Sequence, residues 1–212
     1  MIFARSKRRF VAAVLPVLAA VALMCGGAGA MAEPTRGCGG VKTALGGLYP
    51  LDTTRQAPDI KFTDHRGREF HLSDFRGRPM VITFWKTTCV PCIKEMPHLD
   101  RLQVDMRDEK VLVLAINRDR RAPKVLDFYN TYGIRNLALV TDPFGLAARD
   151  MGISALPMSV VVDGEGVEQA RVIGALDWSL PEVQSALRSC VGLPEKTAEV
   201  DAEVKPEQPV TN

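Results

Sequence analysis

Two cysteines separated by two residues, Cys89 and Cys92, are the side chains of this sequence best suited to chemistry. They stand in the segment WKTTCVPCIKEMP, directly after an apolar run and at the start of a pattern typical of an amphipathic helix. Such a pair can hold a metal ion, form a structural disulfide, or exchange electrons with other thiols. Each possibility makes a different demand on the neighbouring residues.

Electron exchange needs an accessible attacking thiolate and a second thiol that resolves the mixed disulfide. Cys89 is predicted at the tip of the helix, where unpaired N–H groups and the helix dipole favour a negatively charged sulfur. Cys92, one turn further, is predicted to face inward and to act as the resolving thiol. Pro91 falls in the first helical turn, where a proline needs no N–H partner and stiffens the loop. Lys86 either lowers the pKa of the Cys89 thiol or is a solvated surface residue.

The other two possibilities fit the sequence less well. A zinc site needs further ligands, but the other cysteines are far apart and His65, His71 and His98 show no ligand spacing. A structural disulfide across two residues closes too small a loop to be an effective staple. We therefore expect a redox-active dithiol that uses neither a metal nor a cofactor.

The remaining cysteines allow a second bridge. Of the five cysteines, Cys25 lies in the apolar leader, which leaves Cys38 and Cys190 beside the dithiol. A Cys38–Cys190 bridge would join the start of the domain to its last helix and would contribute about 2–5 kcal/mol. The alternative is that Cys190 is a buried free thiol on the apolar face of that helix.

Residues 1–32 have the layout of a secretory signal: a basic start, an apolar run and an A-x-A sequence at residues 30–32. The same stretch, if it is not cleaved, approaches the length that spans a bilayer and would serve as a signal anchor. Either way we expect an exported, periplasmic domain. Four of the 27 basic residues lie in this leader, and the rest of the chain carries 23 basic and 25 acidic residues, which gives no case for nucleic-acid binding.

The patterns beyond the leader predict an α/β fold, with a mixed central sheet flanked by helices on both faces. We expect a linker at 33–57 with a short helix at 41–48, a folded domain at 58–193 and a disordered tail at 194–212. Strands are predicted as an N-terminal hairpin within 60–79, at 80–84, 111–116 and 137–140, and as a pair around the turn at 163–166. Helices are predicted at 89–106, 122–131, 144–151 and 179–192.

The segment FWKTTCVPCIKEMP, with SALPMSVVVD downstream, resembles the thioredoxin superfamily, and in particular the exported TlpA-like thiol-disulfide oxidoreductases. The likeness covers roughly residues 57–192, and residues 122–151 resemble the helix and strand that this subgroup inserts. It implies that Pro157 is a cis proline facing the dithiol and that the backbone of Leu156 pairs with a bound substrate peptide by strand addition. It also implies that Trp85 and Pro91 belong to the substrate-binding surface.

Two departures from the family pattern concern proton transfer and docking. Thr88 stands where the family usually has a second tryptophan, and Thr83 stands where thioredoxin has a buried carboxylate. The base that deprotonates Cys92 is therefore missing or supplied elsewhere, with Glu95 as the candidate. We expect Glu95 to be a solvated helix residue, and a role as this base is the alternative.

The resemblance implies reduction of disulfides in partner proteins, namely apocytochrome c or the copper-site cysteines of an oxidase under assembly, with electrons from a membrane thiol carrier. Oxidation or isomerisation of protein disulfides is the nearest alternative. A thiol peroxidase is disfavoured because Ile82 and Lys86 occupy the proline and threonine positions of the P-x-x-x-T-x-x-C pattern. A copper chaperone is disfavoured because the cysteine spacing is one residue short of C-x-x-x-C.

Overall fold

The computed structural model describes residues 38–43 and 46–195 of the 212-residue chain. The described residues lie in one compact unit. The predicted leader falls outside the described residues, as does all but the first two residues of the predicted disordered tail. None of the described helices is both long enough and apolar enough to cross a membrane.

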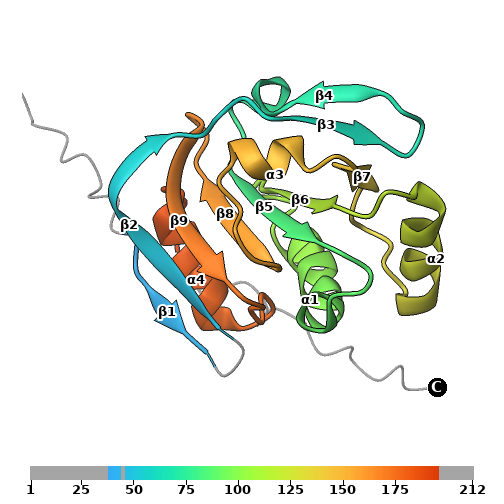
Figure 1. Cartoon of the computed structure of the whole chain (residues 1–212). Coiled ribbons are helices and arrows are strands. Elements are labelled where there is room, and N and C mark those ends of the chain that lie inside the picture. The colour runs from blue at the N-terminus through green and yellow to red at the C-terminus, as the bar shows by residue number, and fades with distance from the viewer. Residues whose placement is uncertain (1–37, 44–45, 196–212) are drawn as a thin grey trace, which may run out of the picture. The chain divides into compact units, whose positions relative to one another are not determined.

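Within the described residues, one nine-stranded sheet forms the centre of the domain (Figure 1). In spatial order its strands are β1 (Val41–Lys42), β2 (Gly47–Gln56), β9 (Val167–Ile173), β8 (Met158–Val162), β5 (Met80–Trp85), β6 (Leu112–Asn117), β7 (Val140–Thr141), β3 (Lys61–Asp64) and β4 (Glu69–His71). The neighbours β5 and β6, and β6 and β7, run parallel, and all other neighbours run antiparallel. The mixed sheet expected from the sequence is confirmed.

Strand β5 is buried along its whole length because both of its faces are covered. Its side chains alternate between two apolar clusters, as the two-residue period of a strand requires. Val81 and Trp85 belong to one cluster, and Met80, Ile82 and Phe84 belong to the other. This strand carries the chain directly to the dithiol.

Helices cover both faces of the sheet, as predicted. The helices α1 (Val90–Asp105), α2 (Ala122–Tyr132) and α4 (Pro181–Cys190) contribute to the cluster that contains Val81 and Trp85. The short helix α3 (Leu146–Asp150) packs with the opposite cluster, beside the 3₁₀ turn Leu72–Phe75 that follows the β3–β4 hairpin. Figure 1 shows α3 on one side of β5 and β8, and α1 on the other.

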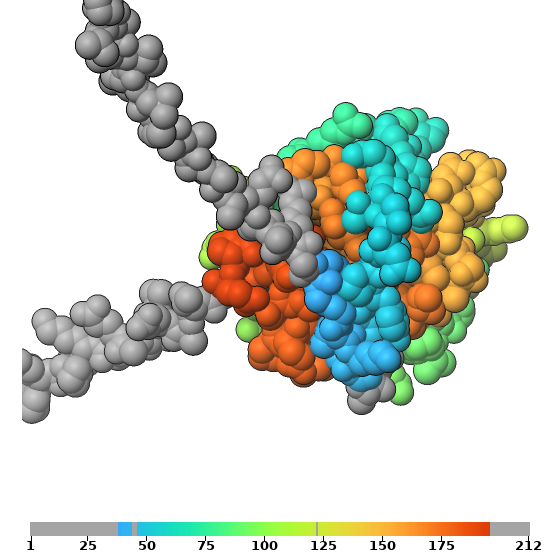
Figure 2. All heavy atoms as spheres, turned by 90° about the vertical axis from the view of Figure 1, so that its left-hand side faces the viewer, coloured from blue at the N-terminus to red at the C-terminus, as the bar shows by residue number. Residues whose placement is uncertain are grey.

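The predicted linker at 33–57 is wrong for its described part. Residues 41–42 and 47–56 form β1 and β2, and β2 pairs with β9 on the sheet edge that lies beside α4 (Figure 2). The first two residues of β2 are buried, but residues 52–56 are exposed. The alternating apolar pattern that reveals a strand is therefore lacking, and pairing with β9 decides the structure. The described residues of the predicted helix at 41–48 form no helix.

The predicted strand at 137–140 is shorter in the structure and begins only at Val140. The Asp100 side chain accounts for this difference. Its Oδ1 accepts hydrogen bonds from the backbone N–H groups of Arg135, Asn136 and Leu137, at 3.0, 2.7 and 3.1 Å. These N–H groups are satisfied by a carboxylate on α1, so this segment forms a loop.

Candidate active site

The dithiol lies where β5 ends and α1 begins. The backbone N–H of Cys89 donates to the carbonyl of Lys86 at 3.2 Å and closes a tight turn. Cys89 is the N-cap residue of α1, and its Sγ accepts a hydrogen bond from the N–H of Cys92 at 3.3 Å. Cys89 is half-buried and Cys92 is fully buried, and the two sulfurs are bonded to each other. The structure thus represents the oxidised dithiol.

This geometry gives the two sulfurs different properties once the bond is reduced. The Cys89 sulfur lies at the positive end of a 16-residue helix and receives an N–H hydrogen bond, and both features stabilise a thiolate. The Cys92 sulfur lies inside the apolar core, where the neutral thiol is favoured. Pro91 is exposed and occupies the first turn of α1, as predicted. The Cys89 sulfur is therefore suited to be the nucleophile, and the buried Cys92 sulfur is suited to be the resolving thiol.

Glu95 is not the solvated residue that we expected. Its side chain is fully buried on α1, three positions after Cys92, so the two side chains share a helix face. Burial raises the pKa of the Glu95 carboxyl from 4.5 to about 7, although hydrogen bonds from Trp178 and Leu176 act in the opposite direction. Its Oε1 accepts from Trp178 Nε1 at 2.8 Å and from Leu176 N–H at 3.2 Å, while Oε2 has no partner among the described residues.

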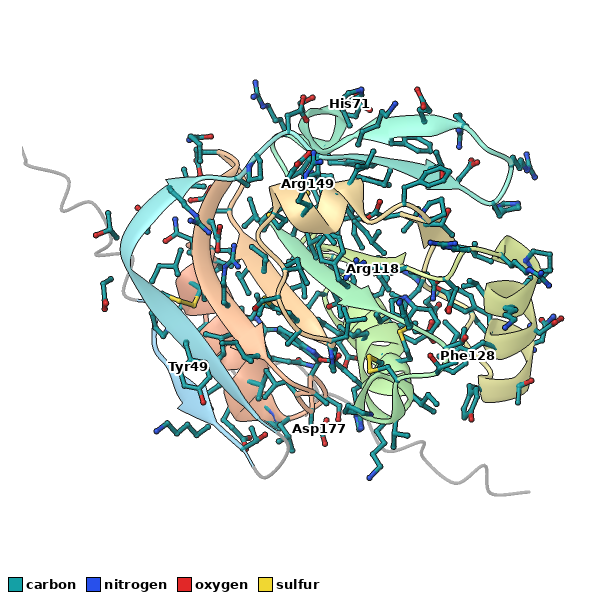
Figure 3. The ribbon with its side chains drawn as sticks, viewed as in Figure 1. Tyr49, His71, Arg118, Phe128, Arg149 and Asp177 are labelled. Atoms are coloured by element: carbon teal, nitrogen blue, oxygen red, sulfur yellow. A yellow bond between two sulfur atoms is a disulfide. The ribbon has the colours of Figure 1, made fainter. Side chains whose placement is uncertain are left out.

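The segment that donates to Glu95 is itself held against α1. Asp177 (Figure 3) lies between the two donor residues in the sequence. Its Oδ1 lies 2.8 Å from Nδ1 of His98, which is one turn after Glu95 on α1. The His98–Asp177 contact thus positions a loop whose other groups fix the Glu95 carboxyl. No local pattern around Glu95 indicates this arrangement, because the donors follow Glu95 by more than 80 residues.

A second carboxylate fixes the turn that precedes Cys89. Asp119 Oδ2 accepts hydrogen bonds from the Thr87 backbone N–H at 2.8 Å and from the Asn117 side chain at 3.0 Å. Asp119 follows β6, which pairs with β5 in parallel, so both strands end at the same edge of the sheet. Sequence reasoning missed Asp119. The available signal was a polar Asn-Arg-Asp run directly after a buried strand, where parallel strands place loop residues side by side.

Leu156 and Pro157 directly precede the residue of β8 that pairs near the end of β5. Their peptide bond is cis, and Pro157 is buried while Leu156 is half-buried. The next residue, Met158, pairs with Phe84 of β5, so this loop meets the end of the strand that leads to Cys89. Leu156 packs against the apolar cluster that contains Cys92. Among the described residues, its backbone N–H and C=O have no hydrogen-bond partner.

Trp85 does not lie on a substrate-binding surface, and that prediction is wrong. Its indole is fully buried, donates to the carbonyl of Ala115 at 3.2 Å and packs against the rings of Phe128 and Tyr129 of α2. A side chain with no exposed area cannot contact a docked peptide, so Trp85 instead anchors the end of β5 to α2. Val90, which lies between the two cysteines, is 64% exposed, and Pro91 is exposed as well.

The position of the thioredoxin carboxylate is filled by two hydroxyl groups. Thr83 is fully buried in β5, and its Oγ1 lies 2.7 Å from Oγ of Ser159 in β8. The two hydroxyl groups hydrogen-bond to each other, so this buried position holds a paired polar contact and no charged group. No proton acceptor for Cys92 is therefore provided from this part of the sheet.

The sulfurs of Cys38 and Cys190 are bonded in the structure. The bridge links Cys38, three residues before the start of β1, to the last residue of α4, across 152 positions of sequence. Cys190 is fully buried in the same apolar cluster as Cys92. As for a metal, no group of three or more His, Cys, Asp or Glu side chains in the described part of the chain is arranged to hold one.

Comparison with known proteins places these features in a family. The model of the AhpC/TSA family matches residues 53–170. Thiol-disulfide oxidoreductase ResA of Bacillus thuringiensis (strain Al Hakam) is 30% identical over 120 residues, which cover 57% of this chain and 69% of ResA. Thioredoxin-like protein YneN of Bacillus subtilis (strain 168) is 30% identical over 125 residues, which cover 58% and 72% of the two chains.

A solved structure agrees with these sequence matches. The thioredoxin domain of a thiol-disulfide oxidoreductase from Bacteroides vulgatus superposes with a TM-score of 0.53 at 25% identity, covering 61% of this chain and 94% of that domain. The matched family region contains the end of β5, the dithiol and the Leu156–Pro157 loop. The chain therefore belongs to the AhpC/TSA family and is a thiol-disulfide oxidoreductase of thioredoxin fold.

Proposed function

We propose that this chain is an exported reductase of protein disulfides and that Cys89 and Cys92 form its reactive dithiol. One observation carries the proposal: a helix-capping, half-buried Cys89 lies next to a fully buried Cys92 that shares a helix face with a carboxyl of pKa about 7. A structural bridge has no need for such an asymmetric pair.

In the first step the Cys89 thiolate attacks one sulfur of a partner disulfide. A new S–S bond joins Cys89 to the partner, and the second partner sulfur leaves as a thiolate that takes up a proton. The helix N-terminus and the Cys92 N–H stabilise the attacking thiolate before the step. Cys89 is then held in a mixed disulfide.

In the second step Cys92 resolves this mixed disulfide. The Cys92 thiol loses its proton, and the resulting thiolate attacks Cys89 Sγ, which restores the Cys89–Cys92 bond and releases the partner as a dithiol. Two electrons have passed from the chain to the partner. The Glu95 carboxylate is the proposed acceptor of the Cys92 proton, because a carboxyl with a pKa of about 7 is present in both forms at neutral pH.

The Leu156–Pro157 loop is the proposed docking edge for the partner backbone. The N–H and C=O of Leu156 are available to pair with an extended peptide. Pro91 and Val90 provide exposed apolar surface at the dithiol itself. Side chains on either side of the partner cysteine would contact these residues.

The partner and the electron donor belong to the same proposal. Apocytochrome c and the copper-site cysteines of an oxidase under assembly are the proposed substrates, and a membrane thiol carrier is the proposed donor. Residues 1–32 are proposed as the signal peptide or anchor that delivers the domain to the periplasm.

The reduction potential of the Cys89–Cys92 couple tests the direction of electron flow. The purified chain would be equilibrated with glutathione or a thioredoxin couple, and the Cys89→Ser/Cys92→Ser variant identifies signals from the other bridge. A potential near or below about −220 mV supports a reductase. A potential near about −120 mV would overturn the reductase proposal and favour a disulfide donor.

The choice of substrate needs a separate measurement. Rates of reduction of an oxidised C-x-x-C-H peptide and of an oxidised copper-site peptide would be compared under single-turnover conditions. A rate that differs by about tenfold or more identifies the preferred class, since this corresponds to about 1.4 kcal/mol in the barrier. Reduction of neither peptide contradicts the proposed substrates.

A further inference from the structure

A polar cleft opens beside the dithiol and plays no part in the chemistry described above. Its volume is about 320 Å³, and it is lined by Lys86, Arg118, Asp119, Arg120, Pro143, Phe144 and Gly145. Lys86 is also the first residue of the turn that Cys89 closes. The cleft and the reactive sulfur therefore share one tight turn, whose ends lie within about 7 Å of each other.

The cleft carries an excess of positive charge. Three of its side chains are cationic and one, Asp119, is anionic. Oδ2 of Asp119 already accepts hydrogen bonds from Thr87 and Asn117. In the described part of the chain, neither Lys86 nor Arg118 nor Arg120 forms an ion pair. These cations are available to an incoming anion.

Arg118 is held in the cleft by the backbone around it. The backbone N–H of Arg118 donates to the carbonyl of Trp85 at 2.9 Å, and the side-chain Nε of Arg118 is buried without a hydrogen-bond partner in the described residues. Gly145 has a positive φ of 71°, and a Cβ at this position would lie 2.7 Å from Nη2 of Arg118. The absence of a side chain at Gly145 therefore leaves room for the guanidinium group. Figure 3 shows Arg118 beyond the end of β6.

The lining of the cleft includes one exposed aromatic side chain. Phe144 is 86% exposed, the largest value among the exposed large hydrophobic side chains of the described residues. A fixed guanidinium group matches a carboxylate with two parallel hydrogen bonds, and an exposed ring adds contact area for a polypeptide. A lone inorganic anion would not use the ring.

We propose that this cleft binds an acidic segment of the protein whose disulfide Cys89 attacks. This proposal rests on the proposed function and adds to it that the partner protein carries acidic residues near its disulfide. An extended segment advances about 3.3 Å per residue. A carboxylate two to four residues from the partner cysteine therefore lies about 7–13 Å from it, which suits a cleft that begins in the turn ending at Cys89.

The test uses three cyclic peptides that each contain one intrachain disulfide. One has Asp and Glu within four positions of each cysteine, one has Asn and Gln there, and one has Lys. Stopped-flow single-turnover rates with the reduced chain, and calorimetric affinities for the oxidised chain, are measured for each peptide. The variant Arg118→Gln/Arg120→Gln is compared with Arg107→Gln/Arg135→Gln, which removes the same charge at exposed positions outside the cleft.

We expect the acidic peptide to be reduced about tenfold faster than its amide counterpart at low ionic strength, and expect added salt to reduce this ratio. Arg118→Gln/Arg120→Gln brings the ratio to within about twofold of unity, whereas Arg107→Gln/Arg135→Gln leaves it unchanged. Equal loss in both variants, or no charge preference in the unmodified chain, overturns the proposal. Arg120→Gln alone, at an exposed position, provides the test if the double variant does not fold.

Two controls separate this proposal from the proposed function. A neutral small disulfide, 2-hydroxyethyl disulfide, reports whether the dithiol of each variant reacts at all. Reaction with that compound but with none of the peptides contradicts the reductase proposal, and the calorimetric comparison still decides whether the cleft binds acidic peptides. An affinity for the acidic peptide that Arg118→Gln/Arg120→Gln does not lower would overturn the cleft proposal even if every peptide were reduced.

Discussion

The indole N–H of Trp178 donates a 2.8 Å hydrogen bond to Oε1 of Glu95, and both side chains are fully buried. The only other donor to this carboxyl in the described residues is the Leu176 N–H. The acidity of Glu95 therefore depends on a balance between burial, which favours the neutral carboxyl, and two donors, which favour the carboxylate.

Replacement of Trp178 by Phe should raise the pKa of Glu95 above about 7. The variant keeps an aromatic side chain, although a smaller one, but removes one of the two donors that stabilise the charged form. A hydrogen bond to a charged group is worth about 1.5–3 kcal/mol, so a rise of about one unit or more is expected. Carboxyl ¹³C chemical shifts across a pH titration measure it. A pKa that stays near 7 in a folded variant contradicts this account of Glu95.

Glu95 should make the oxidised chain less stable as pH rises. Its folded-state pKa of about 7 exceeds the ordinary 4.5, so the stabilising effect of the neutral carboxyl is present below about pH 4.5 and is lost as pH rises through 7. Glu95→Gln removes this dependence. The difference in the free energy of unfolding between Glu95→Gln and the unmodified chain should therefore change by about 3 kcal/mol in favour of Glu95→Gln from pH 4 to pH 8.

Urea unfolding of the two proteins at both pH values measures this change. Glu165→Gln, which replaces a glutamate in the β8–β9 turn, is the matched control. A difference between Glu95→Gln and the unmodified chain that is the same at pH 4 and pH 8 would show that Glu95 titrates normally.

Replacement of Asp119 by Ala should slow the first chemical step. The Thr87 N–H and the Asn117 amide lose their acceptor, so the turn that carries Cys89 becomes less ordered. We expect the rate of reaction of reduced Cys89 with a small disulfide to fall about tenfold, since misplacement of a reacting group is costly. Stopped-flow fluorescence measures the rate, with Asp127→Ala as an exposed control on α2. Equal rates for all three proteins would remove Asp119 from the positioning residues.

The Cys38→Ser/Cys190→Ser variant should lose stability while its dithiol remains functional. Loss of a bridge that closes so long a segment typically costs about 2–5 kcal/mol. The reduction potential of Cys89–Cys92 should not change, because the bridge joins the segment before β1 to the C-terminal end of α4, whereas the dithiol lies at the N-terminal end of α1. Guanidinium unfolding and redox equilibration test the two parts of the prediction separately. A shifted potential would show that the second bridge is coupled to the dithiol.

The sequence predicted the structure correctly where residues close together in the chain determine it. The buried strand β5, the start of α1 at the dithiol and the hairpin at 61–71 follow from local apolar patterns, and the structure confirms them. Pro181 in the first turn of α4 is another such case. These predictions needed no knowledge of distant contacts.

The errors concern residues whose surroundings come from elsewhere in the chain. Glu95 looked solvated because its burial depends on the loop at 176–178, which lies more than 80 residues away. Trp85 resembled a substrate contact, but α2 covers it. Strand β2 lacked an apolar pattern because β9, rather than its own side chains, stabilises it.

Glu95 and Cys92 belong to the same turn of one rigid helix, whereas the two donors to Glu95 belong to a loop. The separation of carboxyl and sulfur is thus set by helix geometry and does not depend on the loop. The proton affinity of Glu95 does depend on the loop, because the loop supplies both hydrogen-bond donors. In this fold, helix α1 sets the distance between the Glu95 carboxyl and the Cys92 sulfur, and a separate loop sets the acidity of the carboxyl.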